Sequence, residues 1–489
     1  MQGLFLCSSH WSSITNRSFS KKGSLYMLGS RLNKKISIYF IGMLSSKILS
    51  VLLIPIYAFY VSTDVLGYYD YTQTVMSFVI PFLYIAIWEA ILKFILSEKN
   101  ENEKKIAIAT SSSFSLFMTG ILIIGFIIYG QFFMGEIKTL ILIGIMFATY
   151  GLALIWQYFA RALEENRTYV FAGIVGTIVN FLLNLLLICI MKLGLNGLFI
   201  SYILGQTSII IIIESKIHVL NNIKIRYINF GMLKSMLLFS APLVLNLTSV
   251  WLMSAFGRLL IVNKLGGEAN GLFSFANKFS LIVTMIGSVV TMALIEEAII
   301  SAKTKGFDSN FTKTIETIFK IFLSIALIAV PLIVIFYAMI STTDYYDSME
   351  YAPWLLLYAV SATMASNIGS VLQAINKTKY QFVTTVIGAL VTVVISYGLI
   401  SSIGIYAVII GQVIGGITML LTRYKLINKF VSFKINWRPI LRMTILFIGT
   451  TVICLNTHFL VSFIVLILAM GIVCYINWNY VKGRLYISS

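Results

Sequence analysis

The feature that most constrains the fold is a succession of apolar runs of about 20 residues, which charged segments separate. As a helix, such a run is long enough to cross the roughly 30 Å hydrocarbon core of a bilayer. Of the 489 residues, 59% are hydrophobic and only 11% are charged, and the mean hydropathy is +0.92, values that soluble globular proteins do not show. Because barrel strands are shorter and alternate in polarity, the sequence predicts an all-α polytopic membrane protein.

The distribution of basic residues tests the number of spans. The apolar runs delimit about fourteen transmembrane helices, from 36–60 to 459–479. Of the 36 Lys and Arg residues, 29 fall on alternate segments that share one side with both termini, as the positive-inside rule requires. We therefore expect both termini in the cytosol, with Met1 or Met27 as the start. Topology and contact with anionic lipid then explain the net charge of +18 without nucleic acid as a partner.

An internal repeat divides the chain into two halves. The segment 67–73 recurs as 271–277, and 194–200 recurs as 404–410, in both cases after about 200 residues. Six spans per copy leave both copies in the same orientation, related by a pseudo-two-fold axis along the membrane normal, which is the plan of many secondary transporters. The predicted organisation is a cytosolic tail (1–35), a six-helix lobe with its cytosolic linker (36–235), a second six-helix lobe (236–425) and a terminal two-helix hairpin with a tail (426–489).

Two basic residues inside spans are the first candidates for a substrate site. A charge near the bilayer centre costs about 2.5–3.5 kcal/mol, so it usually faces the bundle interior or a wet cavity. Lys47 lies near the middle of its span, whereas Arg258 lies close enough to the outer end for its guanidinium to reach the interface. The alternatives are a Lys47 that pairs with a helix carbonyl or with Glu89, and an Arg258 that only extends to the interface.

Trp251 and Ser254 precede Arg258 at spacings that place all three on one face of a continuous helix. An aromatic plate, a hydroxyl and a guanidinium on one face suit a sugar attached to a phosphate. Asn367 belongs to a polar stripe on the tenth span, which either lines the path or makes the helix–helix hydrogen bonds that are commoner in such spans. The candidate substrate contacts are Lys47, Arg258, Trp251, Ser254 and Asn367.

Glu89 is the one carboxylate predicted inside a span, and Lys93 follows it by about one helical turn. This order favours a helical ion pair, so a self-neutralising structural pair is preferred to a role of the two residues in proton or cation coupling. The 4 cysteines and 3 histidines are dispersed and predict neither a disulfide framework nor a metal site. Since no nucleotide-binding motif is present either, no cofactor is expected.

Several short motifs resemble those of the multidrug/oligosaccharidyl-lipid/polysaccharide exporter superfamily. They are Ile54-Pro55 at the end of the first span, the polar turn 62–69, its repeat 266–273, and the cytosolic turns 166–169 and 376–380. Within the superfamily, the chain is most similar to the polysaccharide-repeat flippases (Wzx-type O-antigen translocases) of bacterial inner membranes, over about residues 36–425.

This resemblance implies that the chain moves an undecaprenyl-diphosphate-linked oligosaccharide from the cytosolic to the periplasmic leaflet by alternating access. A basic lumen would hold the diphosphate, and a polysaccharide polymerase and a chain-length regulator would be partners. One departure is that members often carry an acidic residue directly before the basic residue of span 7, where this chain has Gly257. The resemblance therefore leaves Arg258 freer to meet substrate.

Two other functions remain open from the sequence. A multidrug or cation antiporter of the same superfamily needs an acidic lumen, for which Glu89 is the available candidate. A membrane enzyme such as a polysaccharide polymerase or ligase is expected to carry a large periplasmic loop, whereas the longest predicted outer loop is the short segment around Asp344. The sequence thus favours a transporter and not an enzyme.

Overall fold

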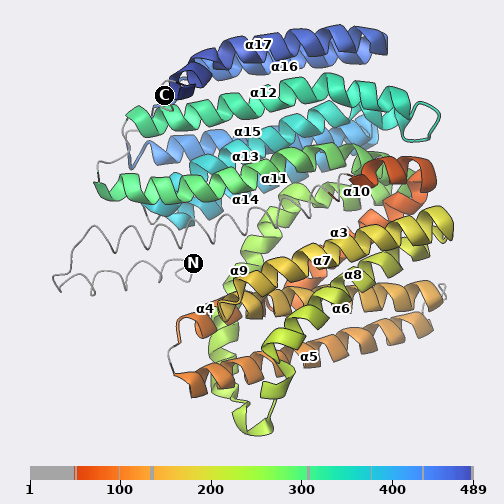
Figure 1. The fold of residues 1–489 in the computed structure, drawn as a ribbon, viewed down its shortest axis with the longest axis vertical. Helices are drawn as coiled ribbons and strands as arrows, with labels where there is room; N and C mark the ends of the chain where they lie inside the picture. The colour runs from red at the N-terminus through yellow and green to blue at the C-terminus, as the bar shows by residue number, and fades with distance from the viewer. Residues whose placement is uncertain are drawn as a thin grey trace. The chain divides into compact units, whose positions relative to one another are not determined.

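The computed structural model describes residues 49, 52–98, 100–132, 137–304, 309–375, 377–431 and 434–485. Within these ranges the regular structure is helical and contains no strand (Figure 1). The chain divides into two compact units, one formed by 1–56 and 71–251 and the other by 57–70 and 252–489. The predicted fold class, an all-α membrane protein with two lobes, is confirmed.

Unit 1 contains the helices from the second half of α3 to most of α9. Their bounds are α3 Thr63–Leu83, α4 Ile87–Leu96, α5 Glu101–Phe132, α6 Ile137–Ala162, α7 Asn166–Asn184 with its π-helical continuation η1 Leu185–Ile190, α8 Gly194–Ile217, the short η2 Leu220–Asn222 and η3 Ile225–Tyr227, and α9 Phe230–Ser254. Unit 2 contains α10 Phe256–Leu265, α11 Gly267–Thr304, α12 Ser309–Met339, η4 Tyr346–Glu350, α13 Ala352–Ala374, α14 Thr378–Ile403, α15 Ile405–Ile427, α16 Trp437–Asn456 and α17 Phe459–Leu485.

Eleven of the described helices are long and apolar enough to cross a membrane, and the bent pair α3 and α4 makes a twelfth. The predicted second span is therefore broken, by 53°. Pro81 lies near the end of α3, and Ile85 and Ala86 adopt left-handed backbone conformations (φ 51° and 47°) that a helix does not continue through. Most of the predicted first span, 36–60, lies outside the described residues, and 52–60 is helical.

The division into units runs through two helices. The chain passes from unit 2 to unit 1 between Asp70 and Tyr71, inside α3, and returns between Trp251 and Leu252, near the end of α9. The terminal hairpin of α16 and α17 belongs to unit 2, where both helices pack on α12. The early segment 57–70 also belongs to unit 2.

Segment 57–70 is fixed in unit 2 by backbone contacts with the repeat copy of its own turn. A Cβ on Gly67 would overlap the carbonyl oxygen of Gly267, and a Cβ on Gly271 would overlap that of Thr63. In the repeat, Gly67 corresponds to Gly271 and Thr63 to Gly267. Each copy therefore makes the same contact with the other, as in an isologous interface. Asn270 adds a hydrogen bond from Nδ2 to the Gly67 oxygen (2.7 Å).

Tyr345, in the loop after α12, holds the same segment from a second side. Its hydroxyl lies 3.0 Å from the carbonyl oxygens of Val61 and Ser62. Burial raises the pKa of the Tyr345 phenol above its ordinary value, so the hydroxyl remains protonated and acts as the donor. The polar turn is consequently held by α11 and by the loop after α12 at one end of unit 2.

Arg423 lies inside α15 and is only 2% exposed. Its guanidinium donates to the carbonyl oxygen of Ala365 on α13 (2.8 Å) and to Thr384 and Thr385 on α14 (3.0 and 2.8 Å). A buried guanidinium needs such partners because water is absent. These bonds join α13, α14 and α15.

Candidate functional site

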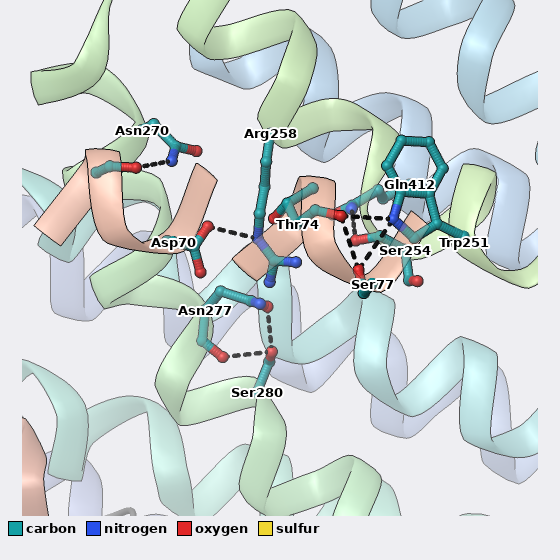
Figure 2. Close-up of polar contacts among 11 residues, drawn as sticks. Asp70, Thr74, Ser77, Trp251, Ser254, Arg258, Asn270, Asn277, Ser280 and Gln412 are labelled. Atoms are coloured by element: carbon teal, nitrogen blue, oxygen red, sulfur yellow. Dashed lines mark hydrogen bonds and ion pairs between the residues drawn. The ribbon is translucent and has the colours of Figure 1, made fainter. Parts of the chain in front are cut away.

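An ion pair between Asp70 and Arg258 forms the centre of the candidate site, in unit 2 (Figure 2). Arg258 Nε lies 3.0 Å from Asp70 Oδ2, and the two side chains are 18% and 20% exposed. Asp70 comes from the second turn of α3 and Arg258 from the first turn of α10. Nε and Oδ2 are paired by charge and distance without forming a hydrogen bond, and the two terminal nitrogens of the guanidinium have no hydrogen-bond partner among the described residues.

Lys278 adds a second cation to this pair. It lies on α11, is half-buried, and interacts electrostatically with both Asp70 and Arg258. Its Nζ lies 4.8 Å from the centre of the Tyr57 ring, within the range of cation–π attraction. Two cations therefore share one carboxylate, and the group of Asp70, Arg258 and Lys278, here called the cationic cluster, carries a net positive charge.

Several polar atoms of unit 2 are buried without a hydrogen-bond partner among the described residues. They include Asn270 Oδ1 and Ser274 Oγ on α11 and Gln412 Oε1 on α15. Buried polar atoms are normally satisfied, so exceptions are sites where a ligand or water can bind. Asn270 and Gln412 are drawn with Asp70 and Arg258 in Figure 2. The first turns of α11 thus carry both a cation and unsatisfied polar groups.

The structure does not place Trp251, Ser254 and Arg258 on one helix face as expected. The predicted span 236–262 is broken at Ala255, whose backbone (φ −123°) lies outside the helical range, so α9 ends at Ser254 and α10 begins at Phe256. In a continuous helix Arg258 would lie on the same face as Trp251 and Ser254. Because of the break, Arg258 instead points toward Asp70. Trp251 belongs to unit 1 and Arg258 to unit 2.

Trp251 is a packing residue between α9 and α3. It is 8% exposed, and its indole N–H lies 3.1 Å from both the Thr74 carbonyl oxygen and Ser77 Oγ. Its ring lies 4.6 Å from the Phe78 ring. The Trp251 indole N–H, which could otherwise donate a hydrogen bond to a sugar, therefore already donates within unit 1.

Replacing Trp251 by phenylalanine should lower the free energy of unfolding by about 1 kcal/mol, because the ring contact stays and the hydrogen bond is lost. Thermal unfolding of the purified protein in detergent measures this change. Trp437→Phe is the matched control, since Trp437 also makes ring contacts but its indole nitrogen has no hydrogen-bond partner among the described residues. Equal effects of the two substitutions would contradict the assignment.

Ser254 and Asn367 differ in burial. The Ser254 side chain is exposed at the end of α9, and its carbonyl oxygen accepts a hydrogen bond from Gln412 Nε2 (3.3 Å). Asn367 is fully buried on α13 and accepts a hydrogen bond from the Thr291 hydroxyl of α11 through Oδ1, whereas its Nδ2 has no partner among the described residues. This is the helix–helix hydrogen bond that the sequence allowed as an alternative.

Glu89 and Lys93 are not paired with each other. Glu89 Oε1 accepts a hydrogen bond from the Tyr158 hydroxyl of α6 (2.9 Å), and Lys93 Nζ lies 3.9 Å from the centre of the Phe239 ring of α9. The i,i+4 pairing fails because each side chain finds a partner on a different neighbouring helix, and tertiary contacts outweigh the few tenths of a kcal/mol of a helical ion pair.

Lys47, the deepest predicted cation, lies outside the described residues. Over the part of the chain that the structure describes, no group of three or more His, Cys, Asp or Glu residues is placed to hold a metal ion. Sequence reasoning missed the roles of Asp70 and Lys278, although Asp70 belongs to the repeated turn that it singled out. The available signal was their position next to that repeat, since both lie within two turns of its glycines.

Comparison with known proteins was made by sequence and by structure. No protein-family model and no curated protein matches the sequence. Among solved structures, the lipid II flippase MurJ in an inward closed conformation superposes with a TM-score of 0.72 at 17% identity, covering 91% of this chain and 100% of that chain. At this identity the likeness concerns the fold.

A second similar structure is a multidrug resistance MATE family transporter of the MOP superfamily. Its inward-facing conformation gives a TM-score of 0.66 at 15% identity, covering 83% of this chain and 98% of that chain. Its outward-facing conformation gives 0.56 at 15% identity, with 84% and 96% covered. This chain therefore has the fold of the MOP-superfamily flippases and transporters.

Proposed function

We propose that this protein is a flippase that moves an undecaprenyl-diphosphate-linked oligosaccharide, the repeat unit of an O-antigen or related polysaccharide, from the cytosolic to the periplasmic leaflet of a bacterial inner membrane. Both termini lie in the cytosol in this proposal, as the distribution of Lys and Arg favours. A polysaccharide polymerase and a chain-length regulator are the proposed partners. The protein is a transporter and not an enzyme.

The observation that carries the proposal is the partly satisfied guanidinium of Arg258. Its Nε pairs with Asp70, and its terminal nitrogens have no hydrogen-bond partner among the described residues. The planar fork of a guanidinium binds phosphate oxygens in a bidentate manner. Lys278 adds a second positive charge nearby, so the cationic cluster suits a group that carries two negative charges, such as a diphosphate.

Asp70 is the counter-ion of Arg258 in the substrate-free state of this proposal. A cation inside a membrane protein that lacks a counter-ion is costly, and Asp70 provides one while no substrate is bound. When the diphosphate arrives, its oxygens compete with a single carboxylate for the guanidinium. The substrate is released when Asp70 regains Arg258, so the ion pair stabilises the empty state of the transport cycle.

The fold supports a lipid-linked substrate. The similar flippase acts on lipid II by its name, and the likeness spans that whole chain. The antiporter alternative, which the MATE likeness keeps open, needs a carboxylate that can take up a cation. Glu89 is hydrogen-bonded by Tyr158 and Asp70 is paired with Arg258, so both described candidates are already engaged.

Deletion of the gene tests the proposal. Lipid-linked repeat units should accumulate on the cytosolic leaflet and surface polysaccharide should fall, because the only step removed is translocation. Protection of the oligosaccharide from a probe added to the outside of spheroplasts measures the leaflet. Normal surface polysaccharide combined with altered tolerance to cationic drugs would contradict the flippase and favour the antiporter.

A further inference from the structure

A pocket of about 980 Å³ lies at the end of unit 2 where α12 ends and α13 begins. It is bounded by η4, the first turns of α13 and α15, and the last turn of α16. Figure 1 shows these helix ends together at the same end of unit 2. None of the residues of the cationic cluster lines it.

The polar part of the pocket is acidic. Its lining includes Asp347 and Glu350 and contains no Lys, Arg or His. Both acidic residues are exposed, and neither forms an ion pair with another described residue. Glu350 is close enough to Tyr351 and Tyr406 to interact with both hydroxyls. A diphosphate would meet two like charges here, so the pocket is unsuited to the proposed substrate headgroup.

Aromatic rings surround the carboxylates. The rings of Tyr351 and Tyr406 meet edge to face with their centres 5.2 Å apart, and Trp354 lines the pocket beside them. The faces of such rings attract cations, and the attraction is stronger for ammonium groups removed from water. Two carboxylates and three rings therefore form a receptor for a positively charged headgroup.

Much of the remaining lining is aliphatic, with side chains from α11, α13, α15 and α16. Ile410, Ile414 and Val452 line the pocket and are 36%, 41% and 48% exposed. Both α15 and α16 are long and apolar enough to cross a membrane, so these exposed aliphatic side chains suit contact with hydrocarbon. The pocket thus combines an apolar wall with an acidic polar end, which suits an amphiphile that carries a cation at its head.

We propose that this pocket binds an amphiphile with an ammonium headgroup, whose cation lies against Asp347 and Glu350 and whose chain lies along α15 and α16. Two sources have this chemistry, an aminophospholipid of the surrounding leaflet and a free alkylammonium amphiphile. The distribution of Lys and Arg places this end of unit 2 outside the cytosol, so the lipid source is the periplasmic leaflet. The site is independent of lipid-linked oligosaccharide transport.

Native mass spectrometry of the full-length protein tests the site, with phosphatidylethanolamine and phosphatidylglycerol of identical acyl chains as probes. The double variant Asp347→Asn/Glu350→Gln should lower occupancy by phosphatidylethanolamine about tenfold, since a desolvated ammonium loses its carboxylates and retains only the rings. Phosphatidylglycerol occupancy should not fall. Thermal unfolding of the variant checks that it is folded.

Asp344→Asn is the matched control, because Asp344 is an exposed acid of the same loop that does not line the pocket. Dodecyltrimethylammonium, added at increasing concentration, distinguishes the sources. Carboxylate-dependent phosphatidylethanolamine binding that the amine does not displace assigns the pocket to the lipid, and carboxylate-dependent binding of the amine that displaces the lipid assigns it to the free amphiphile. If neither ligand depends on Asp347 and Glu350, or if Asp344→Asn has the same effect, the proposal is wrong.

Discussion

Replacing Arg258 by alanine is expected to reduce export of lipid-linked oligosaccharide by about tenfold or more. A charged hydrogen bond to a phosphate contributes roughly 1.5–3 kcal/mol, and each 1.4 kcal/mol corresponds to about a factor of ten. Initial rates of translocation in proteoliposomes measure the change. Lys264→Ala is the matched control, since Lys264 is an exposed cation on the same helix, α10.

The same substitution removes the ion-pair partner of Asp70 and leaves Lys278 as its remaining cation, at a cost of up to about 3 kcal/mol of stability for a largely buried ion pair. The double variant Asp70→Asn/Arg258→Gln separates this loss from the loss of substrate binding. We expect the double variant, in which Lys278 keeps its contact with the Tyr57 ring, to unfold at a higher temperature than Arg258→Ala and still to be defective in export. Wild-type export by either variant would contradict the assignment of Arg258 as a phosphate contact.

Substituting alanine for Gly67 should destabilise unit 2 by about 3 kcal/mol or more, at the upper end of the range for overpacking. The added Cβ would overlap the Gly267 carbonyl oxygen, and a backbone atom cannot move aside as the end of a flexible side chain can. By the repeat relation, Gly271→Ala should have a similar effect, because its Cβ would overlap the Thr63 oxygen.

Thermal unfolding in detergent, followed by tryptophan fluorescence, measures both glycine variants. Gly449→Ala in α16 is the matched control, because a Cβ there has nothing within 4 Å and alanine favours a helix. The control should be neutral or slightly stabilising. If Gly67→Ala unfolds at the same temperature as the control, the close backbone contact does not exist in solution.

The spans and the repeat could be predicted because they are encoded locally. The length of an apolar run and the sign of the connecting segments depend on neighbouring residues, so hydropathy and charge were sufficient. The correspondence of 67–73 with 271–277 was also visible, and it marks the two turns that contact each other through Gly67 and Gly271. Their contact itself could not be predicted, because an alignment shows equivalence and not proximity.

The contacts of the charged residues could not be predicted, because they depend on tertiary packing and not on local sequence. Spacing suggested that Glu89 would bind Lys93, but Tyr158 of another helix provides a better hydrogen bond. Arg258 was placed by assuming a continuous helix, whereas the helix breaks at Ala255, and Gly257 two residues later was the available signal. Such contacts depend on tertiary packing, which periodicity along one helix does not contain.

The membership of segment 57–70 in unit 2 has a consequence for biosynthesis. Asn270 bonds to Gly67 across 203 residues of sequence, and Arg258 and Lys278 follow Asp70 only after residues 71–251 of unit 1. A ribosome therefore delivers Asp70 long before its cations exist, so the turn is synthesised without its partners. We expect the second unit to be completed late, and chains that stall after α8 to be recognised by quality control through this unmatched turn.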